Sequence, residues 1–206
     1  MTIDRILELL AAMSRKMEEQ RDYLTELDNA IADGDHGINM ARGFAAVEQK
    51  MKETDWQDAG ALFKTVGMTL VSVVGGSAGP LYGTAFMRAG MAMTGKSDLT
   101  MDDLIACLGA AIEGVMMRGK AVRGEKTMLD AMIPALDAMT EAHAAGHSPK
   151  ECVQAGIRAA WDGVEYTKTI AATKGRASYI GERSIGHADP GATSFTYLLE
   201  TVADAL

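Results

Sequence analysis

The sequence predicts an all-α fold, and three observations lead to this prediction. Of the 206 residues, 48% are hydrophobic but only 5% are aromatic, whereas strands draw on aromatic and β-branched residues. Met occurs 15 times and Ala is abundant, and both residues favour helices. No segment alternates between apolar and polar residues with the period of a strand. A chain of this length can bury a substantial core, so we expect residues 1–206 to form a single domain.

Helical periodicity, interrupted by Gly, Pro and Asp, divides the chain into about eight helices. In order, they are expected at residues 3–28, 38–52, 56–74, 79–94, 101–118, 127–145, 149–173 and 191–206. The first has charges inside its apolar stripe, so it is an amphipathic helix and not a secretory signal. Ser148 followed by Pro149 is typical of a cap and a first helical position.

Composition also excludes several classes of protein. The net charge of −8 and the absence of a Lys/Arg cluster argue against a nucleic-acid partner. Residues 65–87 carry no charge and are long enough to span a bilayer, but the helix-breaking run 75–80 divides them. We therefore expect two buried helices and no membrane span. Cys107 and Cys152 lie in apolar surroundings that favour reduced thiols, which indicates a cytoplasmic protein.

The connections between the helices carry the unusual chemistry. In an up-and-down bundle the odd-numbered connections emerge at one end, which we call the site end. These connections are the Asp-rich segment after the first helix, the glycine-rich run 75–78, residues 119–126 and the long segment 174–191. The even-numbered connections read as short, ordinary turns. The sequence therefore predicts that one end of the bundle is functional.

The Asp-rich segment predicts a site for a hard cation. Asp28, Asp33 and Asp35 would repel one another unless a cation lay between them, and carboxylates favour Mg²⁺ or Ca²⁺. No Glu stands where a calcium loop needs its bidentate ligand, and no apolar strand precedes the segment as a phosphatase nucleophile would require. A capping loop with solvated charge remains the structural alternative. We favour magnesium.

The other three connections offer groups for a phosphate. Gly75, Gly76 and Ser77 precede a helix with free N–H groups, although glycine-rich turns between close-packed helices are common. Lys174, Arg176 and Arg183 are in the long segment and can neutralise phosphate charge. His36 is interpreted as a contact residue rather than a base, His187 as a residue of a lid, and Met128 as a surface for an adenine ring. The roles of the two histidines stay open.

With these residues in view, the chain resembles the ADP-binding L subunit of bacterial dihydroxyacetone kinase, the DhaL or DAK2 domain family. The resemblance covers nearly the whole chain. It rests on Asp28-x4-Asp33-x-Asp35-His36-x2-Asn39-Met40, on residues 75–84, on Lys126-Thr127-Met128, on residues 175–179, and on Gly191-Ala192-Thr193. The resemblance implies a closed up-and-down barrel of about eight antiparallel helices with the nucleotide site at one end.

The resemblance also implies ligands. Asp28, Asp33 and Asp35 would bind two Mg²⁺ ions that bridge the phosphates of ADP or ATP. The nucleotide-contacting positions would be His36, Ile38, Asn39, Ser77, Ala78, Gly119, Met128, Arg176, Asp189, Pro190 and Gly191. Arg176 would stabilise phosphate charge. The chemistry would be phosphoryl transfer, in which positioning and charge stabilisation dominate, so no nucleophile is expected in this chain.

The family contains two types, which differ in the source of the phosphoryl group. The segment 174–191 and the end of the chain at Leu206, without a K domain, resemble the phosphotransferase-dependent type. That type implies a separate dihydroxyacetone-binding K subunit and a phosphohistidine donor protein of the phosphotransferase system. The alternatives are an ATP-exchanging subunit of a related small-ketose kinase, for example for erythrulose, and a nucleotide-loaded regulatory module. The ketose, the exchange of the nucleotide and a homodimer are left open.

Overall fold

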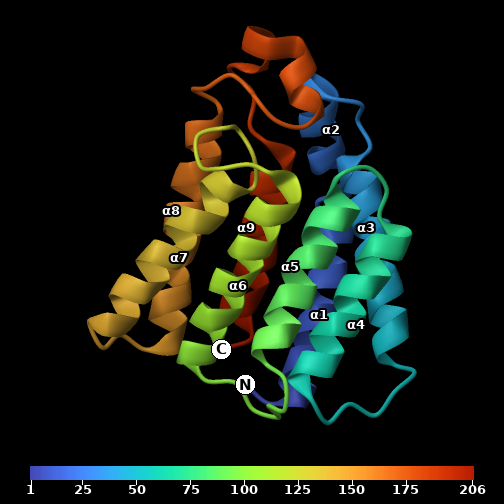
Figure 1. The fold of residues 1–206 in the computed structure, drawn as a ribbon, viewed down its shortest axis with the longest axis vertical. Coiled ribbons are helices and arrows are strands. Elements are labelled where there is room, and N and C mark those ends of the chain that lie inside the picture. The colour runs from blue at the N-terminus through green and yellow to red at the C-terminus, as the bar shows by residue number, and fades with distance from the viewer.

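The computed structural model describes all residues, 1–206, and every element of regular secondary structure is a helix (Figure 1). Its only β-type pairing is an isolated bridge between Thr2 and Asp98. The α-helices are α1 (Ile3–Glu19), α2 (Arg21–Ile31), α3 (His36–Met51), α4 (Ala59–Val73), α5 (Ala78–Ala92), α6 (Met101–Gly119), α7 (Leu129–Ala144), α8 (Pro149–Thr167) and α9 (Pro190–Asp204). A 3₁₀ segment, η1 (Arg176–Ser184), lies between α8 and α9. The all-α prediction is confirmed.

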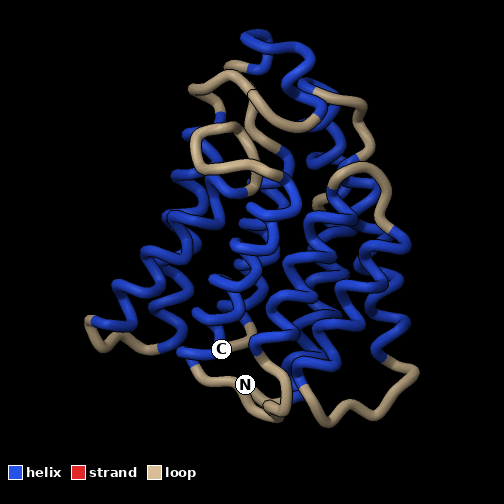
Figure 2. The backbone as a smooth tube through the Cα atoms, viewed as in Figure 1, coloured by secondary structure: helices blue, strands red, loops and turns tan.

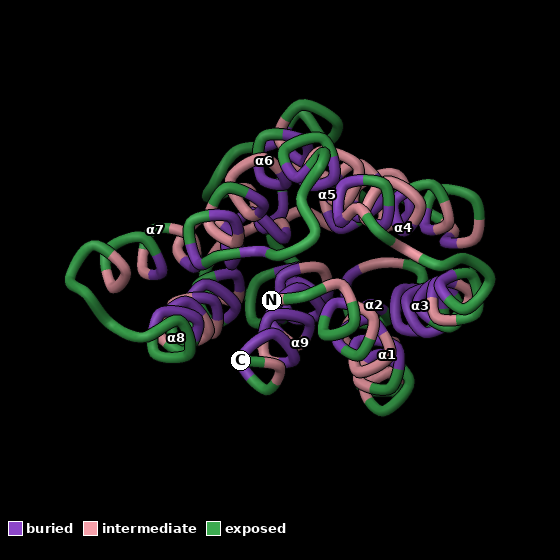
Figure 3. The backbone as a smooth tube through the Cα atoms, turned by 90° about the horizontal axis from the view of Figure 1, so that it is seen from below, coloured by how far each residue is buried: buried purple, intermediate pink, exposed green.

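Eight of the helices form a closed ring. From α3 to α9 each helix packs against the next one in the sequence, and α1 packs against both α3 and α9. Figure 3 shows this ring from below, with buried residues on the inner faces of the helices. One cluster of buried apolar side chains, to which all nine α-helices contribute, fills the interior. Because neighbours in the sequence are neighbours in the ring, alternate connections emerge at the same end.

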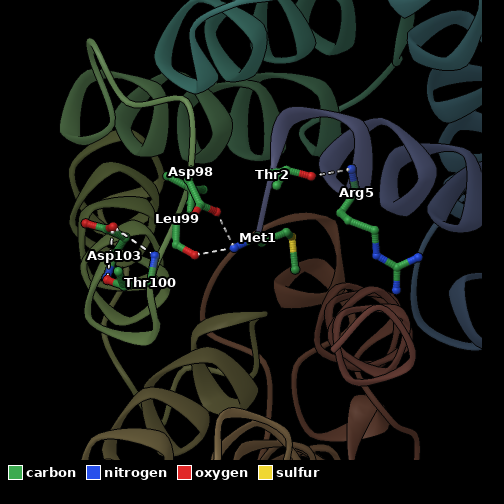
Figure 4. Close-up of polar contacts among 7 residues, drawn as sticks. All are labelled: Met1, Thr2, Arg5, Asp98, Leu99, Thr100 and Asp103. Carbon is green, nitrogen blue, oxygen red and sulfur yellow. Dashed lines mark hydrogen bonds and ion pairs between the residues drawn. The ribbon is translucent and has the colours of Figure 1, made fainter.

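At the end opposite to the site end, the helix N-termini have conventional side-chain caps. The helices α1, α4, α6 and α8 begin there, and each has a side-chain cap, from Thr2, Asp58, Thr100 and Ser148. Figure 4 shows the Thr2 hydroxyl accepting a hydrogen bond from the Arg5 N–H. It also shows the amino group of Met1 donating hydrogen bonds to the Asp98 carboxylate and the Leu99 carbonyl oxygen. The predicted Ser148-Pro149 start of α8 is confirmed, and Glu151 completes a capping box with Ser148.

The long first helix of the prediction was wrong in one respect. Two helices, α1 and α2, replace it, and they meet at Gln20, whose φ of −95° and ψ of 3° are not helical. No Gly or Pro marks this bend. Its physical reason lies in α3, where Gly37 packs onto the backbone of α2: a Cβ at Gly37 would lie 2.0 Å from the Arg21 carbonyl oxygen. The bend turns α2 so that α3 and α9 can both pack against it.

The segment between α8 and α9, residues 168–189, is called the lid below. The helix predicted at 149–173 ends earlier, at Thr167, where the Thr167 hydroxyl donates to the Val164 carbonyl. The lid is not only loop, because η1 occupies part of it, with a break at Gly181 (φ 56°). Figure 2 shows the lid, the loop between α6 and α7 and the turn between α4 and α5 at one end of the bundle. The connections between α3 and α4 and between α5 and α6, at the opposite end, are longer than the short turns that the sequence predicts.

The uncharged stretch 65–87 is divided as predicted. It belongs to the second half of α4 and the first half of α5, which are separated by the residues 74–77, called the glycine turn below. None of the helices combines the length and the apolarity that a membrane-spanning segment needs.

Candidate metal and phosphate site

A cavity of about 420 Å³ opens at the site end, and all four odd-numbered connections contribute to its walls. This volume is in the range of small-molecule sites. The walls come from five segments, namely residues 28–36, 75–82, 115–129, 174–177 and 189–191. The gathering of the four connections at one end, which the up-and-down order of the helices predicts, is thus present in the structure.

The acidic loop, residues 32–35, brings three carboxylates together. Oxygen atoms of Asp28, Asp33 and Asp35 all lie within 4.8 Å of one another. Asp28, in the last turn of α2, is buried, and its Oδ2 accepts hydrogen bonds from the N–H groups of Asp35 (2.9 Å) and His36 (3.2 Å). Gly34 makes the turn at a φ of +73°, where a Cβ would collide with the side chain of Asn29. Asp28 therefore both shapes the loop and faces the other two carboxylates.

This donor set suits a hard cation. Three carboxylates this close repel one another, although Asp33 is exposed and only Asp28 is buried, and their oxygens are the ligands that Mg²⁺ and Ca²⁺ prefer. Arg176 of the lid reaches the same group, with its Nη1 2.7 Å from Asp33 Oδ2. The Arg176 side chain is 57% exposed, so this ion pair alone contributes little stability. Its position does place a positive charge from the lid directly over the acidic loop.

Three of the four helices that begin at the site end lack the conventional caps of the opposite end. The residues before α3, α5 and α7 make no side-chain cap bond. In the glycine turn and at the first residue of α5, the N–H groups of Gly76, Ser77 and Ala78 donate no hydrogen bond within the protein. Free N–H groups at the start of a helix, together with the helix dipole, favour a bound anion. The start of α5 is therefore suited to a phosphate.

The glycine turn and the acidic loop lie side by side. A Cβ at Gly76, which has a φ of +63°, would be 3.9 Å from Asp35 Oδ1. An anion at the start of α5 would thus lie next to a cation held by the aspartates. Such an arrangement is the one that a metal-bound phosphate group requires.

The fourth wall is the start of α9. Asp189 caps this helix by accepting a hydrogen bond from the Ala192 N–H (2.7 Å), and Pro190 occupies the first helical position. Gly191 lies against Met128, because a Cβ at Gly191 would be 3.4 Å from the Met128 Cβ. Burial raises the pKa of Asp189 to about 7; the Ala192 N–H and Lys126 oppose this shift, and the carboxylates of Asp130 and Asp28 add to it.

The raised pKa of Asp189 predicts a pH-dependent stability. The carboxyl binds its proton more tightly in the folded chain (pKa about 7) than in the unfolded one (3.8). Its contribution to stability is therefore fully present below pH 3.8, declines as the pH rises, and is lost once the pH has passed about 7. Asp189→Asn keeps a capping side chain but removes this titration. We expect the variant, free of metal and nucleotide, to gain on the order of a few kcal/mol over wild type near pH 8 and not near pH 4. Urea unfolding at both pH values measures this; an equal difference at both would contradict it.

His36 lies in a buried polar chain behind the acidic loop. Its Nε2 is 2.9 Å from Ser194 Oγ, and Ser194 Oγ is 2.7 Å from Tyr82 Oη. Burial lowers the pKa of His36, against the opposing effect of Asp28 and Asp35, so the neutral ring is favoured. The ring also borders the cavity. Its hydrogen bond to Ser194 connects α3 to α9. His36 therefore also has a structural role, which the sequence analysis did not predict.

The structure brings most of the predicted site residues to the cavity, but not all. The lining includes the three aspartates and His36, Ser77, Ala78, Gly119, Met128, Arg176, Asp189, Pro190 and Gly191. Ile38 and Asn39 are outside it: the Ile38 side chain is half exposed, and Asn39 is buried with its Oδ1 accepting a hydrogen bond from Arg42. Asn39 lies behind the lining, because a Cβ at Gly75 in the cavity wall would be 3.1 Å from its Oδ1.

Several lining residues were given no role from the sequence. Tyr82, Arg118, Thr127 and the fully buried Lys126 border the cavity. Lys126 belongs to a motif that the sequence analysis quotes, yet a lysine in a loop is ordinarily solvated. No local pattern shows that its side chain is buried.

Comparison with known proteins gives consistent matches. Residues 30–204 match the family described as the DAK2 domain. The chain is 42% identical over 184 residues to the PEP-dependent dihydroxyacetone kinase ADP-binding subunit DhaL of Escherichia coli (strain K12), covering 89% of this chain and 88% of that one. It is 41% identical over 206 residues to the PTS-dependent ADP-binding subunit DhaL of Lactococcus lactis subsp. lactis (strain IL1403), covering 100% of this chain and 99% of that one.

A solved structure has the same fold. The dihydroxyacetone kinase from C. freundii, in complex with AMP-PNP and Mg²⁺, superposes with a TM-score of 0.74 at 23% identity. The match covers 97% of this chain but 33% of the C. freundii chain, so this chain spans about a third of that protein.

Proposed function

The chain belongs to the DAK2 domain family, and from this premise we propose that it is the nucleotide-binding subunit of a dihydroxyacetone kinase. In this proposal it holds ADP with two Mg²⁺ ions and relays a phosphoryl group from a phosphohistidine donor protein of the phosphotransferase system. The acceptor is dihydroxyacetone on a separate K subunit. The relatives that this chain covers almost end to end are named as ADP-binding subunits, which supports a subunit role.

One observation carries the proposal: three carboxylates lie beside the uncapped start of α5 in a cavity of about 420 Å³. Asp28, Asp33 and Asp35 would hold the magnesium, and the N–H groups of Ser77 and Ala78 would hold phosphate. When bound, the magnesium nucleotide supplies the group that carries the phosphoryl. The residues of the chain bind and orient this nucleotide. Such a role agrees with phosphoryl transfer, in which the protein itself needs to form no covalent bond with the transferred group.

The remaining walls have complementary roles. Met128 is buried, lies against Gly191 and offers a soft apolar surface for a planar base in a cavity that Gly119 also lines. Arg176 brings a positive charge to the acidic loop from the lid. We propose that this charge stabilises the phosphates and that the lid excludes water from them.

Mass spectrometry under native conditions tests the proposal. We expect the purified protein to carry ADP and magnesium, and chelation to release both. A protein that retains no nucleotide, and binds none in excess Mg²⁺, would contradict the proposal. The donor is tested separately by mixing the chain with a K subunit and dihydroxyacetone. Turnover is expected with the phosphohistidine donor protein, whereas turnover with ATP alone would select the nucleotide-exchanging alternative.

A further inference from the structure

Lys126 is the most unusual charged residue of the structure outside the predicted ligands. It is 1% exposed, although lysine is among the residues most rarely buried. Its backbone has a φ of 59°, in the left-handed region that residues other than glycine avoid. Burial of the ammonium and a strained backbone both cost free energy, and strain of this kind tends to persist where the site depends on it. The contacts of the ammonium show what the position achieves.

The ammonium of Lys126 binds both roots of the lid. At the outgoing root its Nζ donates to the carbonyl oxygens of Thr167 (2.5 Å) and Ile170 (3.4 Å). At the returning root it donates to the carbonyl oxygen of His187 (2.6 Å). Three donors thus meet three carbonyls that are distant from Lys126 in the sequence. A neutral side chain of the same size could fill the space but could not make these bonds.

The electrostatic surroundings favour a cation at this point. Thr167 is the last residue of α8, so its carbonyl lies at the negative end of the helix dipole. Burial lowers the pKa of Lys126, and the nearby carboxylates of Asp189 and Asp130 counteract this effect. Asp130 also fixes the loop that carries Lys126, because it accepts hydrogen bonds from the N–H groups of Gly124 (2.5 Å) and Thr127 (2.8 Å).

The lid that Lys126 holds carries groups of the candidate site. Arg176 extends from it to Asp33, and its returning root leads directly into Asp189, Pro190 and Gly191. The returning root has one more tie to α8, since the Asp189 N–H donates to Thr167 Oγ1 (2.9 Å). Both roots are therefore joined at one point in the wall of the cavity.

We propose that Lys126 is a positioning residue: its ammonium fastens the two roots of the lid together and so sets how long the nucleotide stays in the cavity. The first half of this inference stands on the contacts alone. The second half rests on the proposed function, because it requires a bound nucleotide.

Hydrogen exchange of the nucleotide-free protein tests the first half. Lys126→Met keeps most of the side-chain volume and loses the donors. We expect amides of the lid to exchange at least about tenfold faster in this variant, while those of α4 and α5 exchange as in wild type. Lys126→Arg, which restores a cation, should recover part of the protection. Lys120→Met is the matched control, because Lys120 is in the same loop and also has a positive φ (49°), but is exposed. It should leave the lid unchanged.

A nucleotide release assay tests the second half. We expect ADP, bound with Mg²⁺, to leave Lys126→Met at least about tenfold faster than wild type, with Lys120→Met unchanged. Unchanged lid exchange, or faster exchange throughout the chain, would overturn the positioning role. If Lys126→Met does not fold, Lys126→Gln, which is also neutral and can reach fewer of the three carbonyls, takes its place and must show the same loosening confined to the lid. A wild type that binds no nucleotide would refute the proposed function, yet the lid exchange would still decide the role of Lys126.

Discussion

Asp35→Asn is expected to lower Mg²⁺-dependent affinity for ADP by about 100-fold or more, which corresponds to about 3 kcal/mol, without destabilising the metal-free protein. The amide keeps the size of the side chain but loses the charge that a hard cation needs. The Asp35 carboxylate makes no hydrogen bond within the protein, whereas Asp28 accepts two and Asp33 pairs with Arg176. Removal of its charge also relieves repulsion in the acidic loop.

Calorimetric titration with ADP, with and without Mg²⁺, measures the first part, and thermal unfolding in a chelator measures the second. Wild type should lose thermal stability when a chelator removes the metal and nucleotide, since ligands that bind only the folded state stabilise it. The thermal stability of Asp35→Asn should change little when the chelator is added, because this variant binds little metal and nucleotide beforehand. Asp55→Asn, an exposed substitution in the turn between α3 and α4, should behave as wild type. Wild-type Mg²⁺-dependent affinity in Asp35→Asn would show that the Asp35 carboxylate is not a metal ligand.

The general location of the site could be predicted because its chemistry is local in the sequence. Asp28, Asp33 and Asp35 lie within one short segment, so their proximity did not depend on the tertiary structure. The gathering of the four connections followed from the alternating direction of consecutive helices, which needs only their number and order. An error of a few residues in a helix boundary, such as the end of α8 at Thr167, does not change which end a connection occupies.

What the sequence could not show depends on contacts between distant residues. The hydrogen bond between His36 and Ser194 joins residues 158 positions apart, and that between Lys126 and His187 joins residues 61 apart. No local pattern encodes such pairs, because each side chain alone is compatible with a solvated loop. The bend at Gln20 was missed for a related reason: it has no Gly or Pro, and it arises from the packing of Gly37 against α2.

A large effect on stability is expected at Gly163, where α8 meets α7. A Cβ at this position would lie 2.0 Å from the Asp130 carbonyl oxygen and 2.9 Å from the Ala131 Cα. These are backbone atoms, so no side chain can move aside, and the two helices must separate. We expect Gly163→Ala to lower the free energy of unfolding by about 3 kcal/mol or more. At Gly109 on α6, the nearest atom to a Cβ is 3.9 Å away, so Gly109→Ala should raise it by about 0.5–1 kcal/mol.

Urea unfolding of the two alanine variants measures these opposite changes, and equal effects would contradict the close approach of α7 and α8. Gly163→Ala should also affect the site, because the displaced residue is Asp130, whose carboxylate holds Gly124 and Thr127. Movement of α7 would shift Met128 away from the cavity wall. It would also move the Lys126 ammonium away from the carbonyl groups of the lid. We therefore expect weaker ADP binding in Gly163→Ala even where the protein is fully folded. Gly109→Ala, which leaves Asp130 in place, should bind ADP as wild type does.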